Sequence, residues 1–369
     1  MRNIGIYIHT PFCKQKCPYC DFYSLAGSDN SLRDSYTDTL TKAIALLGER
    51  YPSQADTLYF GGGTPTLLKS ENISKIIDSC RSAFTLSDAE ITLEANPETV
   101  TEEELSALKV AGINRLSMGL QSGVDSELSA LGRRHSSLDA KRAVELAKAA
   151  GIDNVSLDLM LGIPGQTVES ALKSAEFCLS LGIPHISAYM LKIENGTPFY
   201  NIADSLDIPD DDLTADIYEN VSELLRAHGF LRYEISNFAL PGFQSRHNLK
   251  YWNCEEYLGI GPSAHSFIDG KRMFFPRSLD GFLAEKCFNM QYDCEGGSVE
   301  EFIMLRLRLS EGLSLSSLSQ RYPKADISHI KTTAQKLSGF GLVFFDGNKI
   351  SLTDRGVLVS NSVIAEFLS

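Results

Sequence analysis

The first two-thirds of the chain alternates short apolar runs with longer segments of helical periodicity. Each apolar run is bounded by Gly, Pro, Asn or Asp and predicts a strand: residues 5–9, 57–60, 90–95, 115–120, 154–161 and 185–191. The segments between them predict helices: residues 31–50, 70–84, 102–111, 138–150 and 168–181. Gly112, Gly151 and Gly182 follow three of these helices, as C-terminal caps do. This alternation predicts a parallel sheet with helical crossovers.

Polar and Gly-rich positions at the ends of the predicted strands distinguish two ways of closing this sheet. His9, residues 61–65, Glu94, Gln121 and Asp158 all follow strands at their carboxyl ends. Sites spread over many consecutive strands are typical of a barrel, whereas a doubly wound sheet gathers them near one switch point. We therefore predict an α/β fold in which residues 1–230 form a partial (β/α)6 barrel of the TIM type.

The pattern changes twice beyond the predicted barrel. Residues 231–298 are aromatic-rich and interrupted by Gly, which predicts an irregular connecting region. Residues 299–369 predict a small winged-helix-like C-terminal domain, with helices over 299–310, 314–322 and 326–337 before a hairpin of 342–345 and 349–352. Such domains often bind DNA. Here eight Lys/Arg face seven Asp/Glu, so the composition favours a structural or lid role.

Composition and charge narrow the class of protein. The chain has 369 residues, of which 43% are hydrophobic and 22% charged, as in an ordinary globular protein. Its net charge of −13 argues against nucleic acid as a partner, because phosphate binding needs excess Lys and Arg. The first residues do not resemble a signal peptide and no apolar run is long enough to span a bilayer. We expect a cytoplasmic protein that is not an integral membrane protein, with peripheral attachment to the membrane left open.

The eight cysteines are interpreted as thiols or metal ligands, because the cytoplasm is reducing. Cys13, Cys17 and Cys20 lie within one loop after the first strand. Structural zinc takes four ligands, and no fourth cysteine is near, whereas three thiolates suit a [4Fe–4S] cluster with one open iron. Zinc and chance spacing are the alternatives. The other cysteines are expected to be buried thiols: Cys80, Cys178, Cys254, Cys287 and Cys294.

The C-x3-C-x2-C spacing, with the aromatic Tyr19 before the last cysteine, resembles the signature of the radical S-adenosylmethionine (SAM) superfamily. This resemblance implies that SAM chelates the open iron. The run Gly61-Gly62-Gly63-Thr64-Pro65 closes the second strand, and its glycines allow close backbone approach and offer N–H donors. The resemblance implies that this run binds the amino group of SAM through backbone groups.

Further motifs resemble the oxygen-independent coproporphyrinogen III oxidase group. Y-I-H-T-P-F-C, G-G-G-T-P, L-E-A-N-P, S-M-G-L-Q-S, L-G-R and D-L-M-L-G-I-P-G-Q-T follow in order over residues 6–170, and the C-terminal domain is similar as well. The resemblance implies contacts to the SAM on the cluster from Tyr7, Gly62 and Glu94. It implies contacts to a second SAM from a larger set: Tyr19, Gly63, Thr64, Gln121, Arg133 and Asp158.

Two features separate this chain from the oxidase. The oxidase has a fourth cysteine two residues after the third, and Phe22 stands there in this chain. Residues 247–252 read H-N-L-K-Y-W, a motif similar to that of the HemW branch of haem chaperones. The resemblance implies haem binding by His247, Tyr251 and Trp252, and a neutral imidazole is a common axial ligand of haem iron. The alternative is that His247 caps a loop and Trp252 is core; His265 is a second candidate ligand.

These observations predict a haem chaperone that binds haem as cargo and delivers it to haem-requiring membrane or respiratory enzymes. Its [4Fe–4S] cluster and SAM are expected to support dimerisation or haem transfer, without a catalytic residue of its own. The first alternative is an oxygen-independent coproporphyrinogen III oxidase, which decarboxylates propionate side chains by radical chemistry. The second is a radical enzyme that acts on another substrate.

Overall fold

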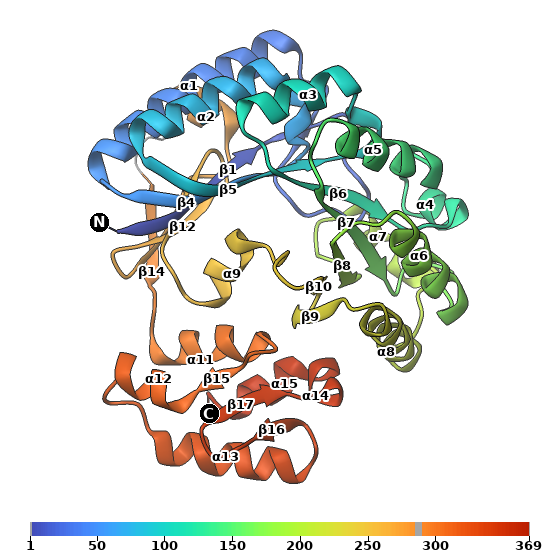
Figure 1. The fold of residues 1–369 in the computed structure, drawn as a ribbon, viewed down its shortest axis with the longest axis vertical. Helices are drawn as coiled ribbons and strands as arrows, with labels where there is room; N and C mark the ends of the chain where they lie inside the picture. The colour runs from blue at the N-terminus through green and yellow to red at the C-terminus, as the bar shows by residue number, and fades with distance from the viewer. Residues whose placement is uncertain (1, 285–289, 369) are drawn as a thin grey trace.

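A curved sheet forms the centre of the computed structural model, which describes residues 2–284 and 290–368 (Figure 1). Its middle strands are parallel and pair in chain order: β1 (Asn3–Thr10), β4 (Gln54–Gly62), β5 (Thr85–Ala95), β6 (Arg115–Gln121), β7 (Asn154–Leu161) and β8 (His185–Met190). The helices that connect them cover the outer side of the arc: α1 (Asn30–Arg50), α2 (Lys69–Ala83), α3 (Glu102–Ala111), α5 (Ser137–Ala149), α6 (Val168–Ser180) and α8 (Asp211–Ala227). The predicted partial (β/α)6 barrel is confirmed.

Local sequence explains why these elements form. Ile4, Ile6 and Ile8 of β1 are fully buried in one core cluster with residues of α1, whereas the alternate residues face the inside of the barrel. Ser136 begins α5 with a capping box, and Gly112 ends α3 at a φ of 117°. The strands are therefore fixed on the helix side, and their inward side chains are left for a site.

The prediction that residues 231–298 form an irregular connecting region is wrong, because these residues extend the sheet at both edges. At one edge β10 (Asn237–Ala239) pairs with β8, and β9 (Leu231–Glu234) pairs with β10. At the other edge β11 (Tyr257–Ile260) lies parallel to β1 and is followed by β12 (His265–Ile268), β13 (Lys271–Phe274) and β14 (Gln291–Glu295). These strands are too short for apolar alternation to reveal them. The helix α9 (Arg246–Trp252) lies inside the arc (Figure 1).

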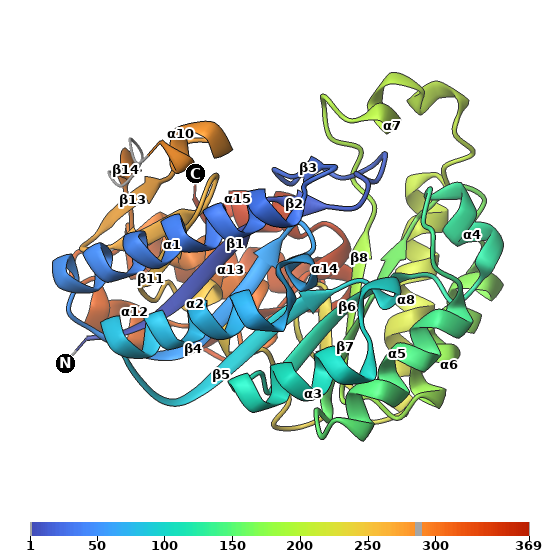
Figure 2. The ribbon, with the colours of Figure 1, turned by 90° about the horizontal axis from the view of Figure 1, so that it is seen from above.

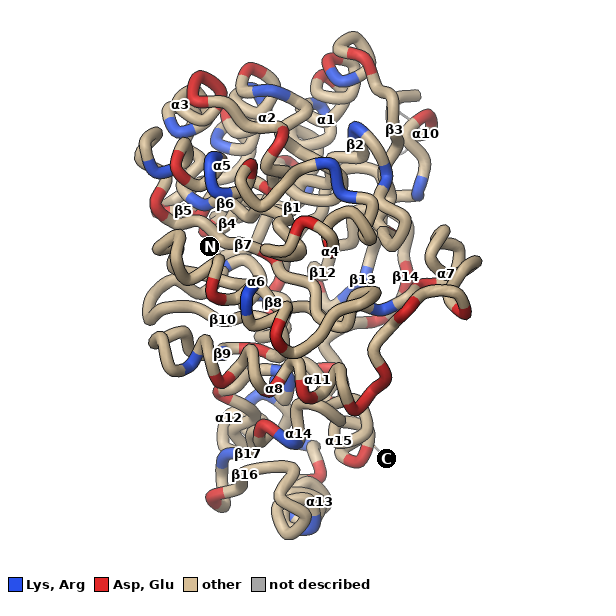
Figure 3. The backbone as a smooth tube through the Cα atoms, turned by 90° about the vertical axis from the view of Figure 1, so that its right-hand side faces the viewer, with Lys and Arg blue, Asp and Glu red and all other residues tan. Residues whose placement is uncertain are grey.

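The C-terminal part lies across the open side of the arc (Figure 1). It contains the predicted helices and hairpin, followed by two short helices: α11 (Val299–Arg308), β15 (Leu313–Ser314), α12 (Leu315–Arg321), α13 (Ile327–Gly339), β16 (Val343–Phe345), β17 (Lys349–Leu352), α14 (Asp354–Leu358) and α15 (Ser360–Glu366). An ion pair of 2.5 Å between Arg272 Nη2 and Glu301 Oε1 joins this part to the sheet extension. Acidic and basic residues are intermingled over the face drawn in Figure 3. Among the described helices, none is long and apolar enough to cross a membrane.

The cysteines outside the first loop are only partly as expected. Cys80, Cys178 and Cys254 are buried thiols, as predicted. Cys294 is exposed, because it lies on β14, the outermost strand of the sheet. Cys287 lies outside the described residues.

Candidate functional site

Short elements surround the carboxyl ends of the barrel strands (Figure 2): β2 (Phe12–Cys13), β3 (Leu25–Ala26), α4 (Asp125–Ala130), α7 (Pro198–Asn201) and α10 (Leu279–Leu283). The cysteine loop runs from β2 to β3, which pair in parallel. The N–H of Cys20 donates to the carbonyl of Cys17 at 3.1 Å and closes a tight turn within it. All three thiols are free and half-buried. Burial raises the pKa of Cys20, and charges on Cys17 and Cys13 raise it further, so the thiols lie within electrostatic reach of one another.

The three thiols of this loop, with donors beside two of them, fit a cluster that is held by three thiolates. In the described part of the chain, no three His, Cys, Asp or Glu side chains converge to hold one metal ion. Two donors instead approach separate thiols: Arg133 Nη1 lies 3.4 Å from Cys17 Sγ, and Thr64 Oγ1 lies 3.7 Å from Cys13 Sγ. Donors of this kind stabilise thiolate charge around a bound cluster.

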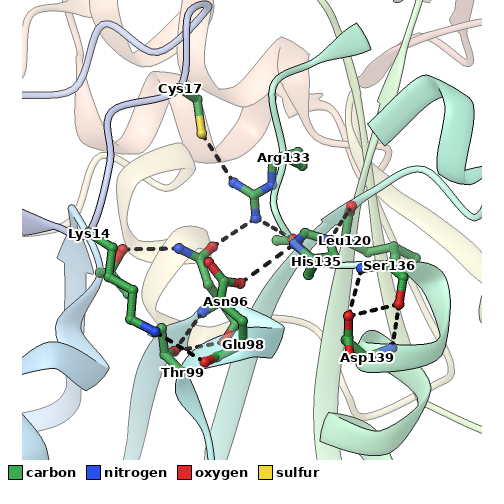
Figure 4. A network of polar contacts seen from close by, with 12 residues as sticks. Lys14, Cys17, Asn96, Glu98, Thr99, Leu120, Arg133, His135, Ser136 and Asp139 are labelled. Atoms are coloured by element: carbon green, nitrogen blue, oxygen red, sulfur yellow. Dashed lines mark hydrogen bonds and ion pairs between the residues drawn. The ribbon is translucent and has the colours of Figure 1, made fainter. Parts of the chain in front are cut away.

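Arg133 is the centre of a polar network beside the cysteine loop (Figure 4). Its Nη2 donates to Asn96 Oδ1 at 2.8 Å and to the carbonyl of Gly119 at 2.7 Å. Asn96 Nδ2 in turn donates to Thr64 Oγ1 at 3.0 Å. Asn96 was not among the predicted site residues, although it belongs to the L-E-A-N-P motif. The network connects two of the three thiols through protein hydrogen bonds.

Glu94 and Asp158 form a carboxylate pair inside the barrel. Glu94 Oε1 accepts from Tyr59 Oη at 2.8 Å, and Glu94 Oε2 accepts from the N–H of Gly62 at 3.2 Å. Burial raises the pKa of Glu94 to about 7 and that of Asp158 to about 6, and the charge of Asp158 adds to the first of these shifts. The ring of Tyr7 stacks on that of Tyr59 with centroids 6.1 Å apart. Tyr59 is therefore a further residue of this site, and no feature of its sequence context distinguished it from a core residue.

Glycine is required at positions 62 and 63 of the glycine run, because the backbone there lies very close to neighbouring groups. A Cβ on Gly63 would lie 2.4 Å from the carbonyl oxygen of Phe12, and one on Gly62 would lie 2.6 Å from the ring of His9. The N–H groups of Gly62, Gly63 and Thr64 all donate within the protein, to Glu94 and to the carbonyls of residues 10 and 12. The expectation that this run offers N–H donors to a ligand is therefore wrong for these three.

Gln121 and Tyr19 complete the set at this end of the barrel. Gln121 ends β6 at a φ of 72°, which is strained for a residue with a side chain, and such strain is concentrated at functional sites. A Cβ on Gly119 would lie 2.8 Å from Gln121 Nε2 and 3.2 Å from Arg133 Nη2, so these two side chains are neighbours. Tyr19 packs edge-on against Phe199 with centroids 6.1 Å apart.

His247 lies deeper in the barrel and uses both of its ring nitrogens. Nδ1 is 2.8 Å from Thr57 Oγ1 and Nε2 is 2.8 Å from Tyr251 Oη. The ring stacks on Tyr59 with centroids 5.1 Å apart, and burial lowers the pKa of His247 to about 3. Trp252 instead contacts the C-terminal part, where Arg308 lies 4.7 Å over its ring. The three residues predicted to bind haem therefore do not share one exposed surface.

Two family models and a solved structure match this chain. Residues 7–178 match the family model of the radical SAM superfamily, and residues 298–359 match that of the HemN C-terminal domain. Coproporphyrinogen III oxidase (HemN) from Escherichia coli has the same fold, with a TM-score of 0.85 over 99% of this chain and 90% of that one, at 22% identity. The fold and the cysteine loop thus define a radical SAM protein, a class that implies a [4Fe–4S] cluster and SAM.

Curated relatives identify the family within this class. Heme chaperone HemW from Bacillus subtilis is 36% identical, with 98% of both chains covered. Heme chaperone HemW from E. coli is 40% identical over 84% of this chain and 83% of its own. Radical S-adenosyl methionine domain-containing protein 1, mitochondrial, from Bos taurus is 33% identical over all of this chain and 88% of its own. The chain belongs to the HemW family.

Proposed function

We propose that this protein is a haem chaperone, which binds haem and delivers it to haem-dependent respiratory proteins. The observation that carries the proposal is the similarity to heme chaperone HemW of B. subtilis along nearly the whole of both chains. Homology at this level over the barrel, the sheet extension and the C-terminal part supports a shared function more strongly than a shared fold does.

Three residues, Cys13, Cys17 and Cys20, are proposed to hold the resident [4Fe–4S] cluster, which with SAM supplies one-electron chemistry. Arg133 and Thr64 would hydrogen-bond to two of these thiolates, at the distances given above.

A further group of residues is proposed to hold SAM at the carboxyl ends of the strands: Tyr7, Tyr19, Gly62, Gly63, Thr64, Glu94, Gln121, Arg133 and Asp158. Within it, the carbonyls of the glycine run would accept from an amino group, and Glu94 would bind hydroxyl groups once it is ionised.

Phe22 is the structural feature that weighs against coproporphyrinogen oxidation. It stands where the oxidase carries its fourth cysteine, and 68% of its surface is exposed. The likeness to the oxidase structure is at 22% identity, so it supports the fold and not the reaction. An apolar ring at the mouth of the site is suited to contact with a flat hydrophobic molecule.

Anaerobic titration of ferric haem into the cluster-loaded protein tests the proposal, beside an assay for coproporphyrinogen III decarboxylation on the same sample. The chaperone proposal expects a saturable Soret band, transfer of haem to an apo-haemoprotein, and no decarboxylation. Protein that decarboxylates the porphyrinogen, or that binds no haem, contradicts it.

A further inference from the structure

One exposed imidazole stands at the rim of the site. His265 begins β12, and its ring stacks on Phe274 of β13 with centroids 5.6 Å apart, because the two residues are paired in the sheet. Among the described residues its ring nitrogens have no hydrogen-bond or ion-pair partner. An imidazole nitrogen without a hydrogen-bond partner is available to a metal. His265 therefore has what His247 lacks, an uncommitted nitrogen on the surface.

This imidazole lies at the same end of the barrel as the cysteine loop. The strand β11 runs parallel to β1 and ends beside it at Ile260, and β12 returns antiparallel to β11, so His265 begins β12 at that end of the barrel. The N–H of Phe275 donates to the carbonyl of Ala264 at 2.8 Å, which holds the segment leading to Arg277 beside His265. His265 and the segment that leads to Arg277 therefore lie together at the mouth of the barrel.

Arg277 and Phe22 supply the remaining features of this surface. Arg277 Nη2 donates to the carbonyl of Asp21 at 2.7 Å, and 53% of the Arg277 side chain is exposed. Phe22 is next in the chain and is 68% exposed. The segments that carry them, near β3 and α10, lie side by side in Figures 2 and 3. We call His265, Phe274, Arg277 and Phe22 the rim surface.

The chemistry of the rim surface matches three parts of haem. Imidazole ligates the iron, aromatic rings pack on the porphyrin faces, and guanidinium pairs with a propionate. We propose that His265 is the axial ligand of the bound haem, with its imidazole held in place by Phe274, the porphyrin against Phe22 and a propionate at Arg277. This inference rests on the proposed function, since haem is the cargo. It places the cargo beside the cysteine loop and outside the barrel.

Titration of ferric haem into full-length, anaerobically reconstituted protein tests the assignment. The variants are His265→Ala and the matched control His329→Ala, which removes an exposed histidine of the C-terminal part. The readouts are the Soret titration and the electron paramagnetic resonance spectrum of the haem. We expect His265→Ala to weaken binding by about tenfold or more and to lose the imidazole signature, which added free imidazole restores. His329→Ala should match the wild type.

The outcomes separate this inference from the proposed function. A His265→Ala protein that keeps wild-type affinity and spectrum overturns the assignment, while haem binding by the wild type still supports a chaperone. Loss of the imidazole signature in His247→Ala alone, in protein with a wild-type circular dichroism spectrum, also overturns it. Wild-type protein that binds no haem overturns the proposed function itself.

Discussion

His247→Ala tests whether this histidine is a structural group of the barrel interior. The substitution removes both ring hydrogen bonds, to Thr57 and Tyr251, and the ring that stacks on Tyr59. Two buried hydrogen bonds and a cavity together cost about 2–4 kcal/mol of unfolding free energy at neutral pH. We therefore expect a clear loss of stability, in contrast to His265→Ala, whose side chain is exposed and should change stability by less than about 0.5 kcal/mol.

The pH dependence of this loss distinguishes a buried neutral imidazole from a general packing defect. The pKa of His247 is about 3 in the folded protein, against an ordinary value of 6.5. Below pH 6.5 the unfolded chain takes up a proton that the folded chain does not, so wild-type stability falls as the pH is lowered. The slope approaches about 1.4 kcal/mol per pH unit. The Ala variant lacks this contribution. The difference in unfolding free energy between the two proteins should therefore narrow by up to about 2 kcal/mol as the pH is lowered from 6.5 to 5.

Urea denaturation followed by far-ultraviolet circular dichroism measures the gap at the two pH values. All other titrating groups are common to both proteins and cancel to first order. His247→Gln, which keeps a polar group and does not titrate, should show the same narrowing with a smaller loss at neutral pH. A gap that is equal at both pH values would refute the reasoning, because His247 would then be protonated or exposed in the folded state.

Three further predictions concern the SAM and cluster residues. Gly63→Ala should lower the unfolding free energy by about 2 kcal/mol in urea denaturation, because its Cβ meets a carbonyl oxygen, whereas Gly339→Ala, with open space around it, should be neutral or stabilising. Wild-type stability should fall as the pH rises from 4.5 through about 7, since the raised pKa of Glu94 disfavours its ionised form in the folded state, and Glu94→Gln should make this fall smaller, with the contribution of Asp158 remaining; equal slopes for both proteins from pH 5 to 8 would contradict this. Arg133→Lys should make the cluster potential more negative in a redox titration, because the donor at Cys17 Sγ is misplaced, and an unchanged potential would count against that hydrogen bond.

The barrel could be predicted because its signal is local. Strands such as β7, in which Val155, Leu157, Leu159 and Leu161 alternate with other residues, are bounded by turn residues, and Ser136 caps the crossover helix α5. The extension of the sheet could not be predicted in this way. The strand β11 has four residues, and its pairing with β1 depends on a contact across most of the chain. Such pairing leaves no periodicity in the sequence.

In the candidate site too, features set by neighbouring residues could be predicted, whereas contacts between residues far apart in the chain could not. Cysteine spacing is local, and the loop formed as expected. The role of Asn96 could not be read from the sequence because it depends on Arg133, which arrives from a later loop. His247 was predicted to bind haem from its motif, but whether its nitrogens are free depends on Thr57, which lies far away in the chain.

Iron and sulfide analysis of the anaerobically reconstituted protein tests the central claim most directly, which is that Cys13, Cys17 and Cys20 hold an iron–sulfur cluster. The claim predicts about four iron and four sulfide ions per chain with a broad thiolate-to-iron absorption band, and loss of both in Cys17→Ser. Colourless wild-type protein without iron, or protein that takes up one zinc ion per chain on these thiols, would contradict it.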